Sequence, residues 1–314
     1  MKLRAYLLML FVVAIWGSTF VVVKAALADA SPAAFNLIRM TLAFAVLAAI
    51  YHRAWRTLRL WQIAAGAVTG FCLALGYQFQ TTGLARTTPS KSAFITGLLV
   101  VIVPFLSLTP GLRPPGAHAP RWNAFLGAAL AFLGIVLLTA PAALHTAGSG
   151  FASMLASLLP DLSSINRGDL LTLGCALGFA FHCIALSHFS PRIGFRALAL
   201  LQVGFCAFFM ALSLPFIEHP QVHWTSRLLL ALAIAALLAT AAAFSIQSWV
   251  QSVLPSTHTA LLLTMEPVFA WITSFIVLHE RLGLRPAGGA LLILMGIALT
   301  ELFPQPHLPT AHEA

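Results

Sequence analysis

Residues 5–23 read AYLLMLFVVAIWGSTFVVV and carry no charged side chain. About 20 apolar residues in an α-helix cross the roughly 30 Å hydrocarbon core of a bilayer, so this stretch predicts a transmembrane helix. The cationic start at Lys2 and Arg4 and the Ala-Leu-Ala at 26–28 also fit a cleavable secretory signal. The length of the apolar stretch and the charge of Lys24 just after it favour a retained helix.

The rest of the chain has the same apolar character. Of its 314 residues, 60% are hydrophobic and 8% are charged, and the mean hydropathy is +0.94. A soluble domain averages about 25% charged residues, so 17 Lys and Arg with 8 Asp and Glu cannot cover a water-facing surface. This composition excludes a soluble globule and a disordered chain. The net charge of +9 is spread along the sequence, which argues against a nucleic-acid partner and is typical of loop charges that orient a membrane protein.

Turn signals divide the chain into ten apolar segments. The sequence therefore predicts an all-α integral membrane protein with ten transmembrane helices, whose surroundings are the lipid bilayer. The helices are expected at 5–25, 32–51, 62–83, 89–108, 122–140, 168–187, 195–217, 227–250, 256–279 and 286–303.

The two halves of the chain repeat one another. GAALAFLGI at 127–135 corresponds to GALLILMGI at 289–297, an offset of 162 residues (289 − 127). At a similar offset Arg39 falls on Gln202. Because each copy holds five helices, an odd number, the second copy is predicted to be inserted upside down. Two inverted five-helix repeats occur in many secondary transporters, with the substrate site near the membrane midplane between them.

The first repeat is predicted to span 1–140, a linker 141–167, the second repeat 168–303 and a tail 304–314. The linker is rich in Ala, Gly and Ser, and its apolar part is too short to cross a bilayer. With the N-terminus in the cytoplasm, nine basic residues lie on the cytoplasmic side, seven on the outside and Arg39 within a helix, which accounts for all 17. This bias favours both termini on the cytoplasmic side.

Patterns for catalysis or metal binding are missing from the sequence. There is no Walker loop and no Gly-x-Ser-x-Gly, and His279-Glu280 lacks the second histidine of a zinc-protease helix. We therefore expect neither an enzyme nor a bound metal or cofactor. The four cysteines lie inside apolar runs without metal-type spacing, so free thiols in the core are expected at Cys72, Cys175, Cys183 and Cys206.

Four stretches together resemble the EamA family of the drug/metabolite transporter superfamily. They are WGSTF at 16–20, TTPSKSAFITGL at 87–98, GDLL at 168–171 and MEPVFA at 265–270. The resemblance covers nearly all ten predicted helices. One departure is His258, at a position where relatives often carry a basic residue.

The resemblance to the EamA family has consequences for fold and function. It implies ten helices in two inverted repeats, both termini in the cytoplasm and a place in the bacterial inner membrane. It also implies transport, often export, of amino acids, other small metabolites or drugs. It does not identify the substrate.

Charged side chains within the bilayer cost about 2.5–3.5 kcal/mol each on insertion scales, so the few in this chain are candidates for function. Glu266 is expected near the middle of the helix 256–279, where it could bind a substrate amine or carry a proton. The alternative is a structural glutamate, bonded across helices or paired with Arg39 or Lys91. The adjacent Pro267, and Pro104 at the corresponding place in the first repeat, are expected to bend their helices.

Two further candidates have equally plain structural alternatives. Arg39 could grip a substrate carboxylate with its planar guanidinium, or tie its helix to carbonyls of a neighbour. His182, which the repeat offset places on Thr19, could relay protons or be a buried, hydrogen-bonded histidine. Lys91, near the start of its helix, is a third candidate for substrate binding.

Polar and aromatic residues of the central helices are expected to line a cavity. Gln80 and Gln247 are repeat mates (247 − 80 = 167), and Gln202 is the mate of Arg39. In lipid such side chains also bond helices together, which is their alternative role. The cavity walls are expected to include Phe20, Tyr77 and Trp249.

These features predict a secondary transporter that works by alternating access around a central cavity. Export of amino acids or related small metabolites is the leading prediction, and the partner is a small-molecule substrate. Efflux of drugs and toxic compounds is the main alternative. A membrane-embedded enzyme is less well supported, because it would need a cluster of His, Asp or Glu at one interface and the chain has only three Asp, none in the middle of a helix. A receptor or chaperone subunit that does not transport would be favoured by a closed, apolar cavity, and saturable flux with counterflow would argue against a pore-type channel.

Overall fold

A computed structural model describes residues 2–113, 122–139, 166–250, 254, 262–263 and 265–302. In these residues the regular structure is helical, apart from one isolated antiparallel bridge between Ala30 and Val222. Seven of the described helices are long and apolar enough to cross a membrane, and three shorter ones are apolar as well. The tail 304–314, most of the linker 141–167 and His258 lie outside the described residues.

Each of the ten predicted segments contains helix. The helices are α1 (Lys2–Ala26), α2 (Pro32–Ile50), η1 (His52–Thr57), α3 (Leu60–Leu84), α4 (Pro89–Thr96), α5 (Leu99–Leu106), α6 (Trp122–Thr139), α8 (Arg167–Phe189), α9 (Phe195–Ile217), α10 (Ser226–Ala233), η3 (Ile234–Ala242), α11 (Ala243–Val250), α13 (Glu266–Leu278) and α14 (Leu284–Leu302). The middle of the segment predicted at 227–250 is a π-helix, η3, rather than an α-helix.

Two predicted segments differ from single, continuous helices. The segment 89–108 is divided by a turn after Gly97 into α4 and α5, and Pro104 lies inside α5 rather than at the break. Glu266 is the first residue of α13, not a residue within it, and Met265 caps this helix. Pro267 therefore occupies the first turn, where its missing N–H leaves no hydrogen bond unmade.

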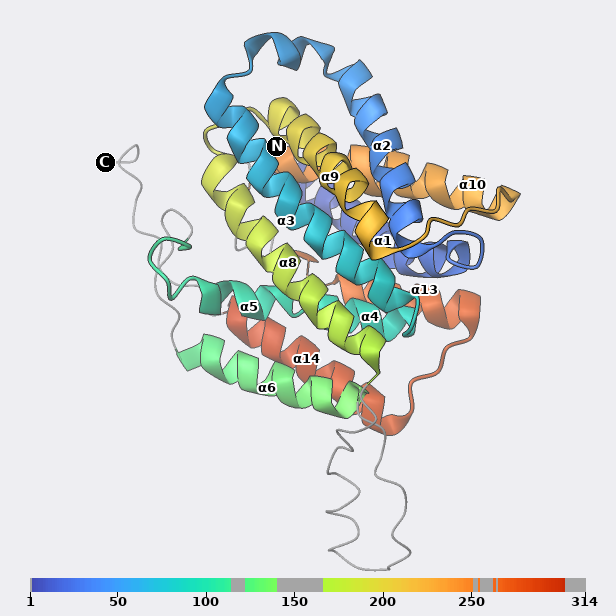
Figure 1. Ribbon diagram of the computed structural model, residues 1–314. Helices are drawn as coiled ribbons and strands as arrows, with labels where there is room; N and C mark the ends of the chain where they lie inside the picture. The colour runs from blue at the N-terminus through green and yellow to red at the C-terminus, as the bar shows by residue number, and fades with distance from the viewer. Residues whose placement is uncertain are drawn as a thin grey trace, which may run out of the picture.

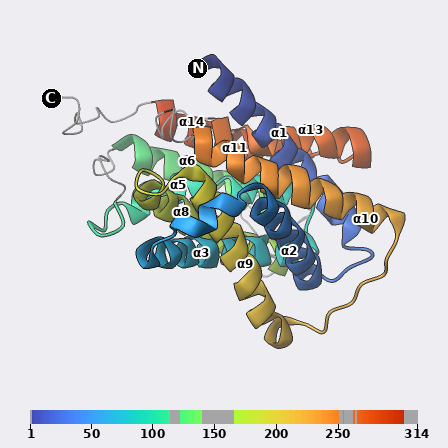
Figure 2. The same ribbon diagram turned by 90° about the horizontal axis from the view of Figure 1, so that it is seen from above.

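The packing of the helices follows the repeat. α1 packs against α13 as α8 packs against α4, and α2 packs against η3 as α9 packs against α3. The last helices of the two halves, α6 and α14, pack against each other, and Figure 1 shows this pair beside α5 at one edge of the molecule. In Figure 2, the view from above, the orange α10 and α11 run between α1 and α2. Every one of these contacts joins one half of the chain to the other.

Glycines allow two of these pairs to approach at backbone distance. A Cβ added to Gly289 of α14 would lie 2.5 Å from the carbonyl oxygen of Gly134 in α6. A Cβ on Gly17 of α1 would lie 2.7 Å from the carbonyl oxygen of Glu266. Small residues at such contacts are typical of helices packed in lipid. Gly17 thus sets the distance between α1 and the start of α13.

A charged contact joins the loop after α1 to the first turn of α10. Arg227 donates from Nε and Nη2 to the two carboxylate oxygens of Asp29, at 2.7 and 2.8 Å. Thr225 donates to the same carboxylate at 2.8 Å. Because these hydrogen bonds favour the ionised form, they lower the pKa of Asp29 to about 2.

Candidate functional site

A cavity of about 70 Å³ lies between helices of the two halves. That volume has room for several water molecules. Its wall includes five aromatic rings, and polar or charged side chains from seven helices. The aromatic residues are Trp16, Phe20, Tyr77, Phe179 and Phe244, and the polar ones are Thr19, Arg39, Gln80, Thr96, His182, Gln247 and Glu266.

Arg39 reaches the cavity from α2 and is held by hydrogen bonds to the protein. Its Nε donates to Thr240 Oγ1 at 2.8 Å, and its Nη2 faces the Tyr77 hydroxyl at 3.2 Å and the Ala239 carbonyl oxygen at 3.4 Å. The guanidinium lies 4.4 Å from the centre of the Tyr77 ring. Only 3% of the residue is exposed. The arrangement matches the structural alternative for Arg39, which ties its helix to a neighbour.

The π-helix η3 supplies the acceptors that hold Arg39. Ala239 O also accepts a hydrogen bond from Trp16 Nε1 at 2.8 Å, and Thr240 Oγ1 donates to Ala235 O at 2.7 Å. A π-helix shifts backbone hydrogen bonding from i+4 to i+5, and such segments are frequent at functional sites. Trp16 on α1 and Arg39 on α2, both in the first half, therefore form hydrogen bonds with η3 of the second half beside the cavity.

Glu266 presents a carboxylate to the cavity from the first turn of α13. Among the described residues it forms no hydrogen bond through its side chain and no ion pair. The expected alternative, pairing with Arg39 or Lys91, is not found among these contacts, because both cations have other partners. The N-terminus of a helix also favours a negative charge at this position.

His182 lies on α8 in the cavity wall. Its Nε2 is 2.9 Å from Gln202 Oε1, and its ring meets that of Phe244 edge to face, with the ring centres 6.0 Å apart. His182 is 3% exposed, and Gln202 is fully buried behind it. Gln202 thus contacts the predicted proton-relay candidate without lining the cavity itself.

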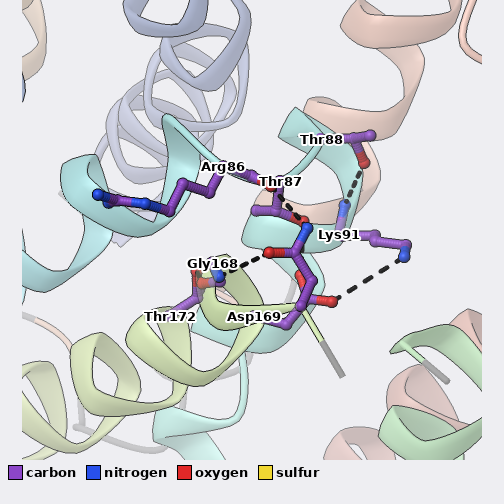
Figure 3. Close-up of polar contacts among 8 residues, drawn as sticks. Arg86, Thr87, Thr88, Lys91, Gly168, Asp169 and Thr172 are labelled. Carbon is purple, nitrogen blue, oxygen red and sulfur yellow. Dashed lines mark hydrogen bonds and ion pairs between the residues drawn. The ribbon is translucent and has the colours of Figure 1, made fainter. Parts of the chain in front are cut away.

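Lys91 lies away from the cavity, at the junction of α4 and α8 shown in Figure 3. Its Nζ is 4.0 Å from Asp169 Oδ2, and Thr87 Oγ1 donates to Asp169 Oδ1 at 2.5 Å. Asp169 is 1% exposed. The sequence predicted Lys91 as a cavity residue and did not predict its partner. That partner, Asp169, belongs to the stretch GDLL at 168–171, which resembles the EamA family.

The structure brings four more of the residues singled out in the sequence to the cavity wall. Gln80, Gln247, Tyr77 and Phe20 line the cavity. Trp249 instead packs in a separate hydrophobic cluster with Met9, Val13 and Val250.

Three aromatic residues of the lining, Trp16, Phe179 and Phe244, were missed, and helical spacing could have found the last two. Phe179 precedes His182 by three residues, and Phe244 precedes Gln247 by three. Residues three apart on a helix share a face, so each polar candidate marked an aromatic neighbour in the wall.

Apolar helices from two similar halves surrounding a partly polar cavity define a membrane transporter. Comparison with known proteins gives the same answer. The model of the EamA-like transporter family matches residues 3–140 and 166–302, and the chain belongs to this family.

Two relatives illustrate how far the similarity extends. An "Uncharacterized transporter" of Archaeoglobus fulgidus is 33% identical over 301 residues, which are 96% of this chain and 87% of the relative. A protein known from a crystal structure superposes with a TM-score of 0.62 at 18% identity, covering 97% of this chain and 98% of the other. The second likeness concerns the fold alone.

Proposed function

We propose that this protein is a secondary transporter that exports amino acids or related small metabolites across the bacterial inner membrane, with both termini in the cytoplasm. The observation that carries the proposal is the carboxylate of Glu266, which lies in a cavity between the two halves without a partner among the described residues. A charge within an apolar bundle is costly unless it meets a ligand, an ion or water.

The way the halves meet supports alternating access. The second repeat is inverted relative to the first, and the cavity lies between them, as in other transporters built from inverted repeats. The first half then rocks against the second around the cavity. The contacts of Arg39 and Trp16 with η3 keep the cavity wall together during this motion.

The sequence has no nucleotide-binding motif, so the driving force is an ion gradient or the substrate gradient itself. Glu266 and His182 are the candidates for proton coupling, because both can bind a proton and both line the cavity. Efflux of drugs is a second candidate function, favoured by the five aromatic rings of the wall, which suit flat apolar compounds.

Flux measurements test this function. The purified protein is reconstituted in liposomes and offered a panel of amino acids and metabolites, with and without an imposed pH gradient. We expect saturable, protein-dependent flux of at least one amino acid or relative. Glu266→Gln is expected to abolish accumulation driven by pH.

Glu218→Gln is the matched control. Glu218 accepts hydrogen bonds from the amides of Ala33 and Ala34 at the start of α2 and does not line the cavity. The Glu218→Gln variant should therefore transport the solute at a rate close to that of the unaltered protein. Absence of protein-dependent flux for every solute would contradict the proposal.

A further inference from the structure

Two side chains of the cavity wall carry hydrogen-bond acceptors that the described part of the chain does not use. One is the Glu266 carboxylate. The other is Gln247 Oε1, which is buried and receives no hydrogen bond from a described residue. Gln247 is 4% exposed and lines the same cavity. Buried acceptors without a donor cost free energy, which a ligand bearing N–H groups would remove.

The guanidinium of Arg39, by contrast, has little left to offer a ligand. A carboxylate gripped bidentately needs two neighbouring N–H groups on one edge of the guanidinium. The guanidinium has one edge formed by Nε and Nη2 and another formed by Nη1 and Nη2. Nε is bonded to Thr240, and Nη2, which both edges share, has acceptors in Tyr77 and Ala239. A substrate carboxylate would have to break these bonds in order to be held by two N–H groups, because only Nη1 has no partner among the described residues.

The remaining wall suits an apolar body that ends in a cation. Trp16, Phe20, Phe179 and Phe244 place aromatic rings around the cavity, beside the Tyr77 ring already covered by Arg39. Aromatic faces attract cations as well as apolar groups. The wall therefore has two acceptors without a described donor, several aromatic rings and one guanidinium whose edges are already engaged.

We propose that the cavity recognises the ammonium group of its substrate, and that the substrate class is a primary organic amine with an apolar or aromatic body. The ammonium donates to the Glu266 carboxylate and to Gln247 Oε1. A carboxylate on the same molecule, where one is present, is not held by Arg39. This inference rests on the proposed function, because it names the substrate class of the same site.

Three ligands that each contain a phenyl ring separate the contribution of the amine from that of the carboxylate. Phenethylamine has the amine alone, phenylalanine has amine and carboxylate, and 3-phenylpropionate has the carboxylate alone. Their dissociation constants are measured from the rise in Tm of the purified, full-length protein in detergent, and their flux is measured in liposomes. We expect phenethylamine to bind at least as tightly as phenylalanine and at least tenfold more tightly than 3-phenylpropionate. Gln247→Leu should weaken the binding of phenethylamine severalfold.

The unaltered protein alone decides the order of the three ligands, so the test does not depend on any variant being folded. If 3-phenylpropionate binds as tightly as phenethylamine, or if phenethylamine does not bind, the amine assignment is wrong. If the ligands bind in the expected order and none is transported, the assignment holds and the proposed transport is wrong.

Discussion

Arg39 and Glu266 are both charged side chains in the wall of one cavity, but their surroundings are opposite. Arg39 has hydrogen-bond partners on two of its three guanidinium nitrogens and an aromatic ring beneath it. Glu266 has no side-chain partner among the described residues. The difference teaches that charge within the bundle does not by itself identify a ligand contact. A buried charge with protein partners holds the fold together, whereas one without them is available to a ligand.

The contrast predicts that Arg39 is needed for stability. Arg39→Ala should lower the free energy of unfolding by about 2–4 kcal/mol, because it removes several hydrogen bonds of a buried charge and the packing of its stem. The measurement is thermal unfolding in detergent. Arg192→Ala is the matched control, since Arg192 is exposed, and changes at exposed positions usually alter stability little. Equal losses for the two variants would contradict the contrast.

Thr240 tests the acceptor side of the same contact. Thr240→Val keeps the shape of the side chain but leaves Arg39 Nε without its acceptor. We expect a loss of about 1–2 kcal/mol in the free energy of unfolding. In the double variant with Arg39→Ala, the loss of unfolding free energy should be much smaller than the sum of the two single losses, because both substitutions remove the same hydrogen bond. Full additivity would show that the contact carries no energy.

Tyr77→Phe is expected to have a smaller effect, about 0.5–1 kcal/mol in the free energy of unfolding. The hydroxyl is lost, but Arg39 Nη2 keeps Ala239 O as an acceptor and the ring remains below the guanidinium. Thermal unfolding measured beside Thr240→Val would reveal the order. A larger loss for Tyr77→Phe than for Thr240→Val would reverse the assigned importance of the two bonds.

The pair of Asp29 and Arg227 shows how a solvated charge pair differs. The pKa of Asp29 is lowered to about 2 in the folded protein, below the value of about 3.9 usual for an unfolded chain. Its contribution to stability is therefore fully present above about pH 4 and is lost as the pH falls through 2. Asp29→Asn lacks this contribution, so its Tm should lie below that of the unaltered protein near pH 7, and the difference should shrink as the pH falls through 2. An unaltered acid dependence would contradict the assigned pKa.

Much of this arrangement could be predicted from the sequence. Apolar runs long enough to cross a bilayer placed helix in all ten segments, and the scarcity of charge directed attention to Glu266 and Arg39. Positions separated by the repeat offset placed Gln80 and Gln247 in one cavity. These features depend on length, composition and spacing, which the sequence contains directly.

What the sequence did not predict depends on contacts across the bundle. Pro267 suggested a bend within a helix, but in the structure α13 starts at Glu266, and the carbonyl of Glu266 lies close to Gly17 of the other half. The π-helix has no sequence pattern of its own and is held by Arg39 and Trp16 from the other half. Lys91 was assigned to the cavity because depth along a helix does not reveal direction, and its partner Asp169 lies 78 residues away (169 − 91).

The most direct test compares the binding of phenethylamine to the unaltered protein and to Glu266→Gln. At a concentration about 100 times its dissociation constant, a ligand stabilises the state that binds it by about 2.7 kcal/mol, which a thermal-unfolding experiment resolves easily. We predict that without ligand Glu266→Gln unfolds within about 0.5 kcal/mol of the unaltered protein, because no described contact is lost. We also predict that phenethylamine stabilises the unaltered protein and Glu218→Gln but not Glu266→Gln. Equal stabilisation of all three would show that Glu266 does not contact the ligand, which would contradict the account.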